Sequence, residues 1–135
     1  NKYKEALESY GKNLGLTFQI ADDTLDYNSD LKLFGKDIGN DFYEGKITLP
    51  IILLFQKINE NEKQLLKELF LKDHRTENDF KKVLELIKKN NVIHECYKKA
   101  EHYINIASNS LNIFQNSYEK NILKNLTTFS LERNF

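Results

Sequence analysis

Apolar residues recur every three to four positions along most of this chain of 135 residues, which is the spacing of amphipathic helices. Chain breakers are scarce, with one proline and five glycines, too few for the many turns of an all-β fold. The pattern therefore predicts an all-α protein. The expected helices cover residues 2–28, 49 to about 57, 61–72, 77 to about 89, 92–114 and 118 to about 133.

Polar residues stand where these helices are expected to begin and end. Thr48, just before an apolar run that contains the single proline, is a good N-cap. Thr76 with Asp79 three residues later has the form of a capping box, and Ser117 is suited to cap the last helix. An Asn-Asn pair at 90–91 predicts a break between two helices.

A helical wheel of residues 2–28 separates three lines of side chains. Two apolar stripes lie on nearly opposite sides, so the second half of this helix is expected to be buried. One stripe contains Tyr3, Leu7, Tyr10, Leu14, Ala21 and Leu25, and the other contains Leu16, Ile20 and Tyr27. The third line contains Gly11, Gly15, Phe18, Gln19, Asp22 and Asp26, with Asp23 at its edge. This arrangement predicts an open apolar groove that leads from the two glycines to a group of carboxylates.

The carboxylates of Asp22, Asp23 and Asp26 stand in an otherwise apolar stretch, FQIADDTLDY. Like charges in such a place repel each other and are costly unless a cation neutralises them. Mg²⁺ typically takes one or two carboxylates together with waters and phosphate oxygens. The sequence therefore favours Mg²⁺ at these aspartates. The alternative is that the glycines permit close helix packing, and that the aspartates cap or solvate a helix end.

A loop rich in glycine and aspartate is expected over residues 29–48. It carries Lys36 and Lys46 among Gly35, Asp37, Gly39, Asp41 and Gly45. Lysines flanked by glycines suit a phosphate ligand, although the spacing of a Walker A loop is absent. The alternative is that both lysines are solvated loop charges.

Composition narrows the class of protein further. Basic and acidic residues balance at 20 each, so no overall field attracts nucleic acid or an anionic membrane. No apolar run approaches the roughly 18 residues of a membrane span. The single cysteine, Cys96, favours a reducing compartment such as the cytoplasm. Because the sequence contains no methionine, we expect it to be part of a longer polypeptide, whose remaining part would decide whether the protein enters an organelle matrix.

Two stretches in the first fifty residues resemble a known family. YGKNLGLTFQIADDTLDY, followed by GKDIGNDFYEGKITLP, is similar to the second aspartate-rich region of the trans-isoprenyl diphosphate synthases, or polyprenyl synthetases. That region has a DDxxD motif on a helix preceded by FQI, and then a loop of the form GK…G.D…GK.TLP. The terminal FSLERNF also resembles the end of these enzymes.

The resemblance implies that residues 1–135 form the C-terminal helices of an isoprenoid synthase bundle that acts as a Mg²⁺-dependent prenyltransferase. In this reaction an allylic diphosphate ionises, isopentenyl diphosphate attacks the allylic cation, and loss of a proton leaves a longer polyprenyl diphosphate. The implied site residues are, for the metal, Asp22, Asp23 and Asp26; for the substrate, Phe18, Gln19, Lys36 and Lys46; and, for catalysis, Asp22, Asp23 and Lys36.

The family's first DDxxD motif and its upstream Lys-Thr pair are absent from this sequence. We therefore expect the N-terminal half of the same domain to supply them, and residues 1–135 to be inactive alone. The form GNDFYEGKITLP, together with the C-terminus, resembles the long-chain, octaprenyl-type enzymes that make quinone side chains more than the farnesyl-type ones. The resemblance also implies a homodimer. The alternatives are a non-catalytic partner subunit of a heteromeric synthase and a terpene cyclase, whose second metal motif usually differs from DDTLD.

Other residues are assigned no chemistry. His94, Cys96 and His102 offer at most three metal ligands, so a zinc site is not expected. Four aromatic residues are expected in the core or at a subunit interface: Tyr97, Tyr103, Phe114 and Phe129.

Overall fold

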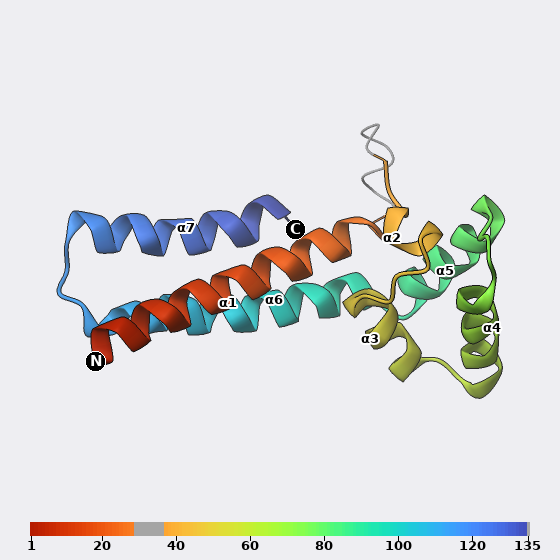
Figure 1. Ribbon diagram of the computed structural model, residues 1–135, viewed down its shortest axis with the longest axis horizontal. Helices are drawn as coiled ribbons and strands as arrows, with labels where there is room; N and C mark the ends of the chain where they lie inside the picture. The colour runs from red at the N-terminus through yellow and green to blue at the C-terminus, as the bar shows by residue number, and fades with distance from the viewer. Residues whose placement is uncertain (29–36, 135) are drawn as a thin grey trace. The chain divides into compact units, whose positions relative to one another are not determined.

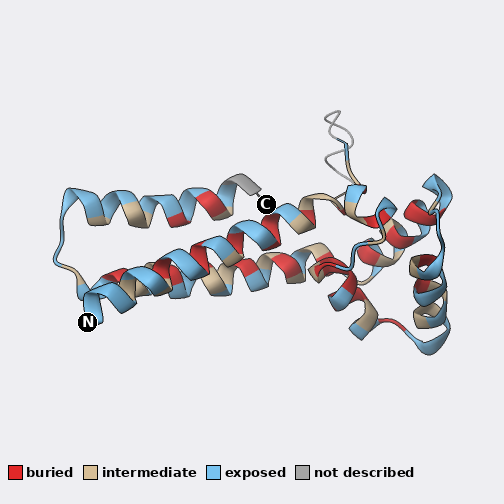
Figure 2. Ribbon diagram, in the orientation of Figure 1, coloured by how far each residue is buried: buried red, intermediate tan, exposed pale blue. Residues whose placement is uncertain are grey.

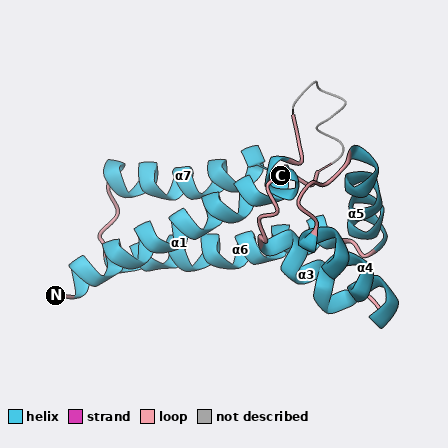
Figure 3. Cartoon of the chain, turned by 45° about the vertical axis from the view of Figure 1, so that its right-hand side comes forward, coloured by secondary structure: helices cyan, strands magenta, loops and turns pink. Residues whose placement is uncertain are grey.

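Helices make up all the regular structure in the computed structural model, which describes residues 1–28 and 37–134, with side chains as far as Glu132 (Figures 1 and 3). The elements are α1 (Lys2–Leu25), α2 (Asn40–Tyr43), α3 (Leu49–Lys57), α4 (Glu60–Leu71), α5 (Glu77–Lys89), α6 (Val92–Ser110), the 3-10 helix η2 (Leu111–Ile113) and α7 (Tyr118–Asn134). The all-α prediction is confirmed. None of the helices in the described ranges is both long enough and apolar enough to cross a membrane.

The first helix is shorter than predicted, because α1 ends at Leu25 and not at residue 28. The Tyr27 amide donates to the Thr24 carbonyl at 3.0 Å, and the Asn28 amide donates to the Leu25 carbonyl at 3.2 Å. These bonds span three residues, so they form turns and do not extend the α-helix. As a result Asp26 lies beyond the end of α1 and not on its side, where the wheel had placed it.

The glycine-rich loop contains a short helix, α2, that the pattern did not predict. Gly39 precedes it with φ of 92°, and Gly45 follows it with φ of 74°. Only glycine adopts such angles without strain, so the two residues let the chain enter and leave one helical turn. A helix of four residues is too short to show a hydrophobic period, which is why the sequence did not reveal it.

Two of the three helix caps expected from the sequence are formed by side-chain bonds, whereas Thr48 stands at the N-cap of α3 but its hydroxyl makes no cap hydrogen bond in the described structure. Thr76 and Asp79 form the predicted capping box at the start of α5, and the Lys120 amide donates to the Ser117 hydroxyl at 3.1 Å before α7. An unpredicted capping box of Asn59 and Glu62 starts α4 one residue earlier than expected. The long helix expected over 92–114 is divided, because α6 ends at Ser110 and η2 follows it.

The chain forms two compact units, one of residues 1–22 and 97–135 and one of residues 23–96. We describe them separately as the first and the second unit. In the first unit, the Thr17 hydroxyl on α1 bonds to the Ala100 carbonyl on α6 at 3.4 Å, and the Tyr10 hydroxyl bonds to the Leu123 carbonyl on α7 at 2.9 Å. The core between these helices contains Tyr10, Leu14, Ile104, Ala107 and Leu111.

Part of the predicted core face of the first helix is not buried. Tyr3 and Leu7 are 47% and 48% exposed, whereas Tyr10 and Ala21 on the same stripe are buried (Figure 2). The burial therefore begins one to two turns further along the helix than the stripe predicted. Among the four aromatics expected in the core or at an interface, Phe129 on α7 is 55% exposed.

The second unit is built from short helices around a cluster of aromatic rings. The Phe42 ring on α2 lies 5.5 Å from the rings of both Phe70 on α4 and Phe80 on α5, measured between centroids. The Tyr27 ring lies 6.0 Å from the Phe80 ring. Because Phe42 and Phe80 are 0% and 4% exposed, this cluster anchors α2 and the turn after α1 to the rest of the unit.

Candidate metal and diphosphate site

The carboxylate of Asp26 is held by the loop that follows it. Its Oδ2 atom accepts a hydrogen bond from the Asp41 amide at 2.7 Å, across fifteen residues of sequence. Asp41 is the second residue of α2, so its amide is one of the helix-terminal donors that have no partner within the helix. The bond therefore satisfies that amide and attaches the start of α2 to the end of the DDTLD stretch.

The side chain of Asp41 adds a further carboxyl group to this place. Burial raises its pKa to about 6, with a hydrogen bond to the Asp26 carboxyl and the charges of Asp26 and Asp23 acting in the same direction. The charge of Lys46 opposes the increase. Three carboxyl groups and one lysine of the second unit therefore influence one another, and we call Asp23, Asp26, Asp41 and Lys46 the acidic cluster. The sequence had assigned no role to Asp41.

Tyr27, the residue directly after Asp26, has only 1% of its surface exposed. Its hydroxyl group is buried and has no hydrogen-bond partner within the part of the chain that is described. Burial raises the pKa of this phenol, and the charges of Asp41, Asp26 and Asp23 raise it further. Tyr27 therefore remains neutral at physiological pH and offers a proton donor next to the carboxylates.

The other predicted site residues are not gathered in this way. Asp22 is exposed on α1 as the last residue of the first unit's N-terminal segment, and Phe18 and Gln19 are exposed earlier on the same helix. Lys36 lies outside the described residues. A Cβ atom added at Gly11 or Gly15 would meet nothing within 4 Å, so no helix of the described chain packs closely on these glycines.

No group of three or more His, Cys, Asp or Glu side chains in residues 1–28 and 37–134 is arranged to hold a metal ion by itself. The ligand set Asp22, Asp23 and Asp26 therefore stays a prediction. The acidic cluster nevertheless suits a hard divalent cation, because Asp23, Asp26 and Asp41 supply carboxylate oxygens, and burial together with the neighbouring carboxylates raises the pKa of the Asp41 carboxyl.

Arg75 is a residue of this region that the sequence reasoning missed. Its guanidinium group bonds to main-chain carbonyls at the ends of α2 and α4, among them Phe42 and Lys72, each at 2.7 Å. It lies just before the N-cap of α5. The sequence offered one signal for Arg75, which is its residue type. Only two of the chain's twenty basic residues are arginines, and arginine is the residue suited to several planar hydrogen bonds.

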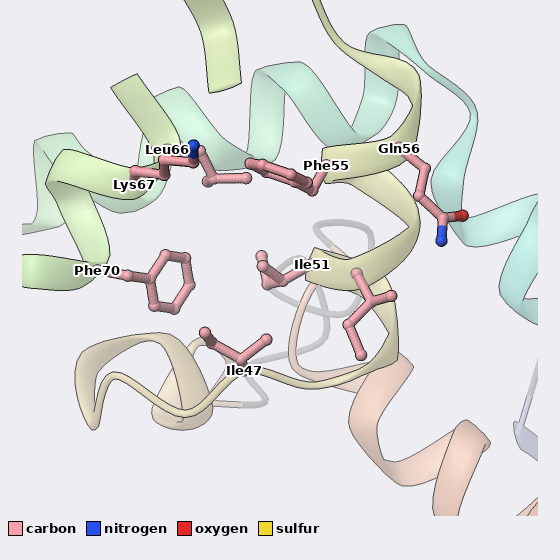
Figure 4. Close-up of a pocket in the computed structure, with 8 residues that line it drawn as sticks. Ile47, Ile51, Phe55, Gln56, Leu66, Lys67 and Phe70 are labelled. Carbon is pink, nitrogen blue, oxygen red and sulfur yellow. The ribbon is translucent and has the colours of Figure 1, made fainter. Parts of the chain in front are cut away.

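An apolar groove of about 330 Å³ lies between α3 and α4 of the second unit (Figure 4). It is lined by Ile47, Ile51, Ile52, Phe55, Gln56, Leu66, Lys67 and Phe70. Ile47 directly follows Lys46 of the acidic cluster and is 61% exposed. The groove therefore begins one residue from the cluster, and it is distinct from the open line predicted along Gly11 and Gly15.

Cys96 is a core residue in the second unit, with 0% of its surface exposed. Burial raises the pKa of its thiol to about 11, although a hydrogen bond with Thr24 acts in the opposite direction. The thiol is therefore protonated at physiological pH, whereas metal ligation needs a thiolate. His94 and His102 are exposed on α6 and belong to different units.

This chain is similar to known proteins in both sequence and fold. The family model described as "Polyprenyl synthetase" matches residues 1–87. An all-trans-nonaprenyl-diphosphate synthase (geranyl-diphosphate specific) of Rhodobacter capsulatus is 32% identical over 132 residues, which cover 98% of this chain and 40% of that protein. This chain therefore spans about two fifths of the length of such relatives.

Solved structures show the same fold. A decaprenyl diphosphate synthase from Rhodobacter capsulatus superposes with a TM-score of 0.90 at 28% identity, over 99% of this chain and 41% of that one. A polyprenyl synthase from Caulobacter crescentus, complexed with calcium and isoprenyl diphosphate, superposes with a TM-score of 0.85 at 35% identity, over 97% of this chain and 40% of that one.

Proposed function

This chain belongs to the polyprenyl synthetase family, and on that premise we propose that it is the C-terminal part of an all-trans polyprenyl diphosphate synthase. The observation that carries the proposal is the acidic cluster, in which the loop amide of Asp41 holds Asp26 beside Asp23 and Lys46. The cluster consists of the residues by which the sequence resembles the family's second aspartate-rich region. The relatives reported above are named as synthases, and none is named as a non-catalytic subunit.

The proposed reaction joins two diphosphate substrates. The carbon–oxygen bond of the allylic diphosphate breaks, a carbon–carbon bond forms to isopentenyl diphosphate, a proton leaves, and inorganic diphosphate is released. The charge that develops on the leaving diphosphate is the main demand on the protein, so preorganised opposite charge is the expected contribution of the site. Lys46, on a backbone held between Gly45 and α3, is a donor suited to that charge.

Mg²⁺ is the proposed metal, with Asp22, Asp23 and Asp26 as its carboxylate ligands. When bound, it would neutralise the diphosphate of the allylic substrate and so make that group easier to lose. The chain's own part is to keep the Asp26 carboxylate oriented, through the Asp41 amide 2.7 Å from it. The calcium and isoprenyl diphosphate of the Caulobacter crescentus structure support a divalent cation and a diphosphate at this kind of site.

The remaining residues follow the same assignment. Lys36 would bind the allylic diphosphate together with Lys46, while Phe18 and Gln19 would border the allylic cation. Gly11 and Gly15, where an added Cβ meets no atom within 4 Å, would leave room for the hydrocarbon chain. These roles follow from the match to the family motif and from the open surface of α1.

The proposal also covers the rest of the protein, its product, its oligomeric state and its location. Since relatives of this family are about two and a half times as long, the first aspartate-rich motif would come from an N-terminal half of the same domain. The nonaprenyl and decaprenyl names of the relatives support a long-chain product suited to a quinone side chain. We further propose a homodimer in the cytoplasm or an organelle matrix.

The test is to incubate the full-length gene product with an allylic diphosphate, isopentenyl diphosphate and Mg²⁺, and to measure the polyprenyl products. We expect elongation that stops when the metal is chelated. Residues 1–135 alone should give no multiple-turnover elongation, because they carry only one of the family's two aspartate-rich motifs. A full-length protein that binds both substrates but releases no diphosphate would contradict the proposal, and so would elongation by residues 1–135.

A further inference from the structure

We propose that Arg75 is a positioning residue for the acidic cluster, and that it acts by holding α2 in the conformation that presents the Asp41 amide and Lys46. The inference rests on the proposed function, because that function makes the acidic cluster a metal and diphosphate site. The contacts of Arg75 themselves lie entirely within the second unit. No feature of the family motif includes this residue.

The guanidinium group of Arg75 bonds to five main-chain carbonyl oxygens. Its Nε donates to Phe42 at 2.7 Å, its Nη1 donates to Lys72 at 2.7 Å, Leu69 at 3.3 Å and Phe70 at 3.4 Å, and its Nη2 donates to Tyr43 at 3.3 Å. The acceptors form two groups. One group is the last two residues of α2, and the other is the last turn of α4 with its C-cap.

Both groups are the carbonyl ends of helices. The last carbonyls of a helix lack partners within it and carry partial negative charge, so a cation placed there satisfies them and opposes the helix dipole. Arg75 does this for two helices at once. A helix of four residues has little stability of its own, and α2 therefore depends on such contacts from outside.

The fixed end of α2 leads directly to the acidic cluster. At its other end, the Asp41 amide donates to Asp26 Oδ2 at 2.7 Å. After α2, the Lys46 amide donates to the Asp41 carbonyl at 2.8 Å. This bond keeps the backbone of Lys46 beside Asp41 of the acidic cluster. A displacement of α2 by the loss of Arg75 would therefore move both the donor to Asp26 and the backbone of Lys46.

Gly45 provides the space for the guanidinium group. A Cβ atom at this position would lie 2.7 Å from Arg75 Nη2 and 3.0 Å from its Cζ, and φ is 74°. Position 45 therefore requires glycine for two reasons, which are the positive φ and the space that the guanidinium group occupies. The effects of substitutions at Gly45 and Arg75 should therefore be coupled. Gly45→Ala should lower the free energy of unfolding less when the guanidinium group has been removed than in the wild type.

The experiment compares Arg75→Ala and Arg75→Lys in the full-length gene product with Lys72→Ala as the matched control. Lys72 Nζ bonds to Asp79 of α5 at 2.8 Å, so its loss removes a cation and an ion pair of the same unit while leaving the Phe42 and Tyr43 carbonyls of α2 bonded. Arg75→Lys keeps the charge but loses the planar fork that reaches both helices.

The expected result is a weaker site with a stable fold. In Arg75→Ala, the Mg²⁺ concentration for half-maximal elongation and the KM for the allylic diphosphate should rise about 10- to 100-fold, the range seen when residues that orient metal ligands are removed. Arg75→Lys should recover little of this loss, whereas millimolar guanidinium ion should partly restore Arg75→Ala. Lys72→Ala should leave both constants within about twofold even where it lowers the melting temperature.

Hydrogen exchange separates this inference from the proposed function. The Asp41 and Lys46 amides should exchange at least about tenfold faster in Arg75→Ala, while amides of α7 stay unchanged. Unchanged exchange at these two amides would overturn the positioning role, whether or not the protein elongates prenyl chains. Faster exchange with unchanged metal and substrate constants would also overturn it. Absence of elongation by the wild type would instead overturn the proposed function, since the exchange result does not depend on activity.

Discussion

The two compact units differ in what holds their helices together. The first unit packs α7 and most of the long helices α1 and α6, mainly through apolar side chains with a few hydroxyl-to-carbonyl bonds between them. The second unit packs shorter helices around the buried rings of Phe42 and Phe80 and adds polar contacts across the sequence, of which the Arg75 bonds and the Asp26–Asp41 bond are the clearest. The acidic cluster lies in the second unit, where the chain repeatedly leaves helical geometry and main-chain amides and carbonyls become available for other contacts.

The contrast predicts that the first unit tolerates substitutions better than the second. An apolar stripe on a long helix is redundant, since many small contacts share its stabilisation. The single-turn helix α2, which is held by one buried ring and two sets of polar contacts, has fewer contacts to share the loss. Substitutions of the same kind in the two units are therefore the direct way to test the comparison.

The largest expected effect is at Asp26. Asp26→Ala in the full-length gene product should lower kcat/KM at least about 100-fold, because a charged group that organises the transition state is lost. The fold outside α2 should remain, since removing one of several repelling carboxylates relieves charge when no metal is bound, whereas α2 loses its bond to Asp26. Steady-state kinetics with circular dichroism at several Mg²⁺ concentrations measures both. Glu8→Ala on the exposed part of α1 is the control in the first unit, and unchanged turnover in Asp26→Ala would show that the acidic cluster is not the metal site.

Alanine substitutions at Gly39 and Gly15 compare how the two units contribute to the free energy of unfolding. Gly39→Ala should destabilise the protein by about 1–3 kcal/mol, the cost of a strained backbone, because φ is 92° and the new Cβ would lie 2.8 Å from the buried Phe80 ring. Gly15→Ala should stabilise it by about 0.5–1 kcal/mol, because a helix-interior glycine there meets nothing within 4 Å. Chemical denaturation measures the free energy of unfolding of both variants. Equal effects would mean that the two units do not differ in this way.

A larger side chain at the same position tests the open line on α1. Gly15→Leu should leave the Mg²⁺ dependence nearly unchanged but shorten the products or raise the KM for the allylic substrate, because the side chain would occupy the space proposed for the hydrocarbon. Chain-length analysis of the products, with Gly15→Ala as the smaller control, measures this effect. If Gly15→Leu gives the same products and KM as the wild type, the glycine line faces something other than the hydrocarbon.

The smallest expected effect concerns the pH dependence of stability through Asp79. A hydrogen bond from Lys72 and one from the Thr76 amide lower the pKa of this carboxyl from 3.8 to about 2. A lowered folded pKa means that the stabilisation is complete above the unfolded value near 3.8 and is lost as the pH falls towards about 2. Urea denaturation of the wild type and of Asp79→Asn between pH 6 and pH 2 should show a steeper acid-side loss in the wild type. Parallel curves would contradict the assigned cause.

Much of the fold could be predicted from the sequence, because long helices and their caps depend on neighbouring residues. The hydrophobic period placed the helices of the first unit, and Thr76 with Asp79 and Ser117 marked starts that the structure confirms. The errors lie where distant residues decide. The helix expected to end at 28 ends at Leu25, and Asp26 beyond it accepts the Asp41 amide; the one-turn helix α2 escaped detection because its stability comes from Arg75 and Phe42 contacts.

The candidate site divides in the same way. The types and order of Asp22, Asp23, Asp26, Lys36 and Lys46 can be recognised along the sequence, since a metal and a diphosphate demand those functional groups. The roles of Asp41, which the loop motif contains, and of Arg75 could not be recognised, because they depend on which carboxyl, amide and carbonyl groups lie beside these residues in space. The sequence by itself determined the all-α class, the family and the kinds of charge present. Only the tertiary structure decided that the Asp26 carboxylate meets an amide fifteen residues away and that one guanidinium group ties the ends of two helices, because hydrogen bonds depend on distance and direction and not on order along the chain.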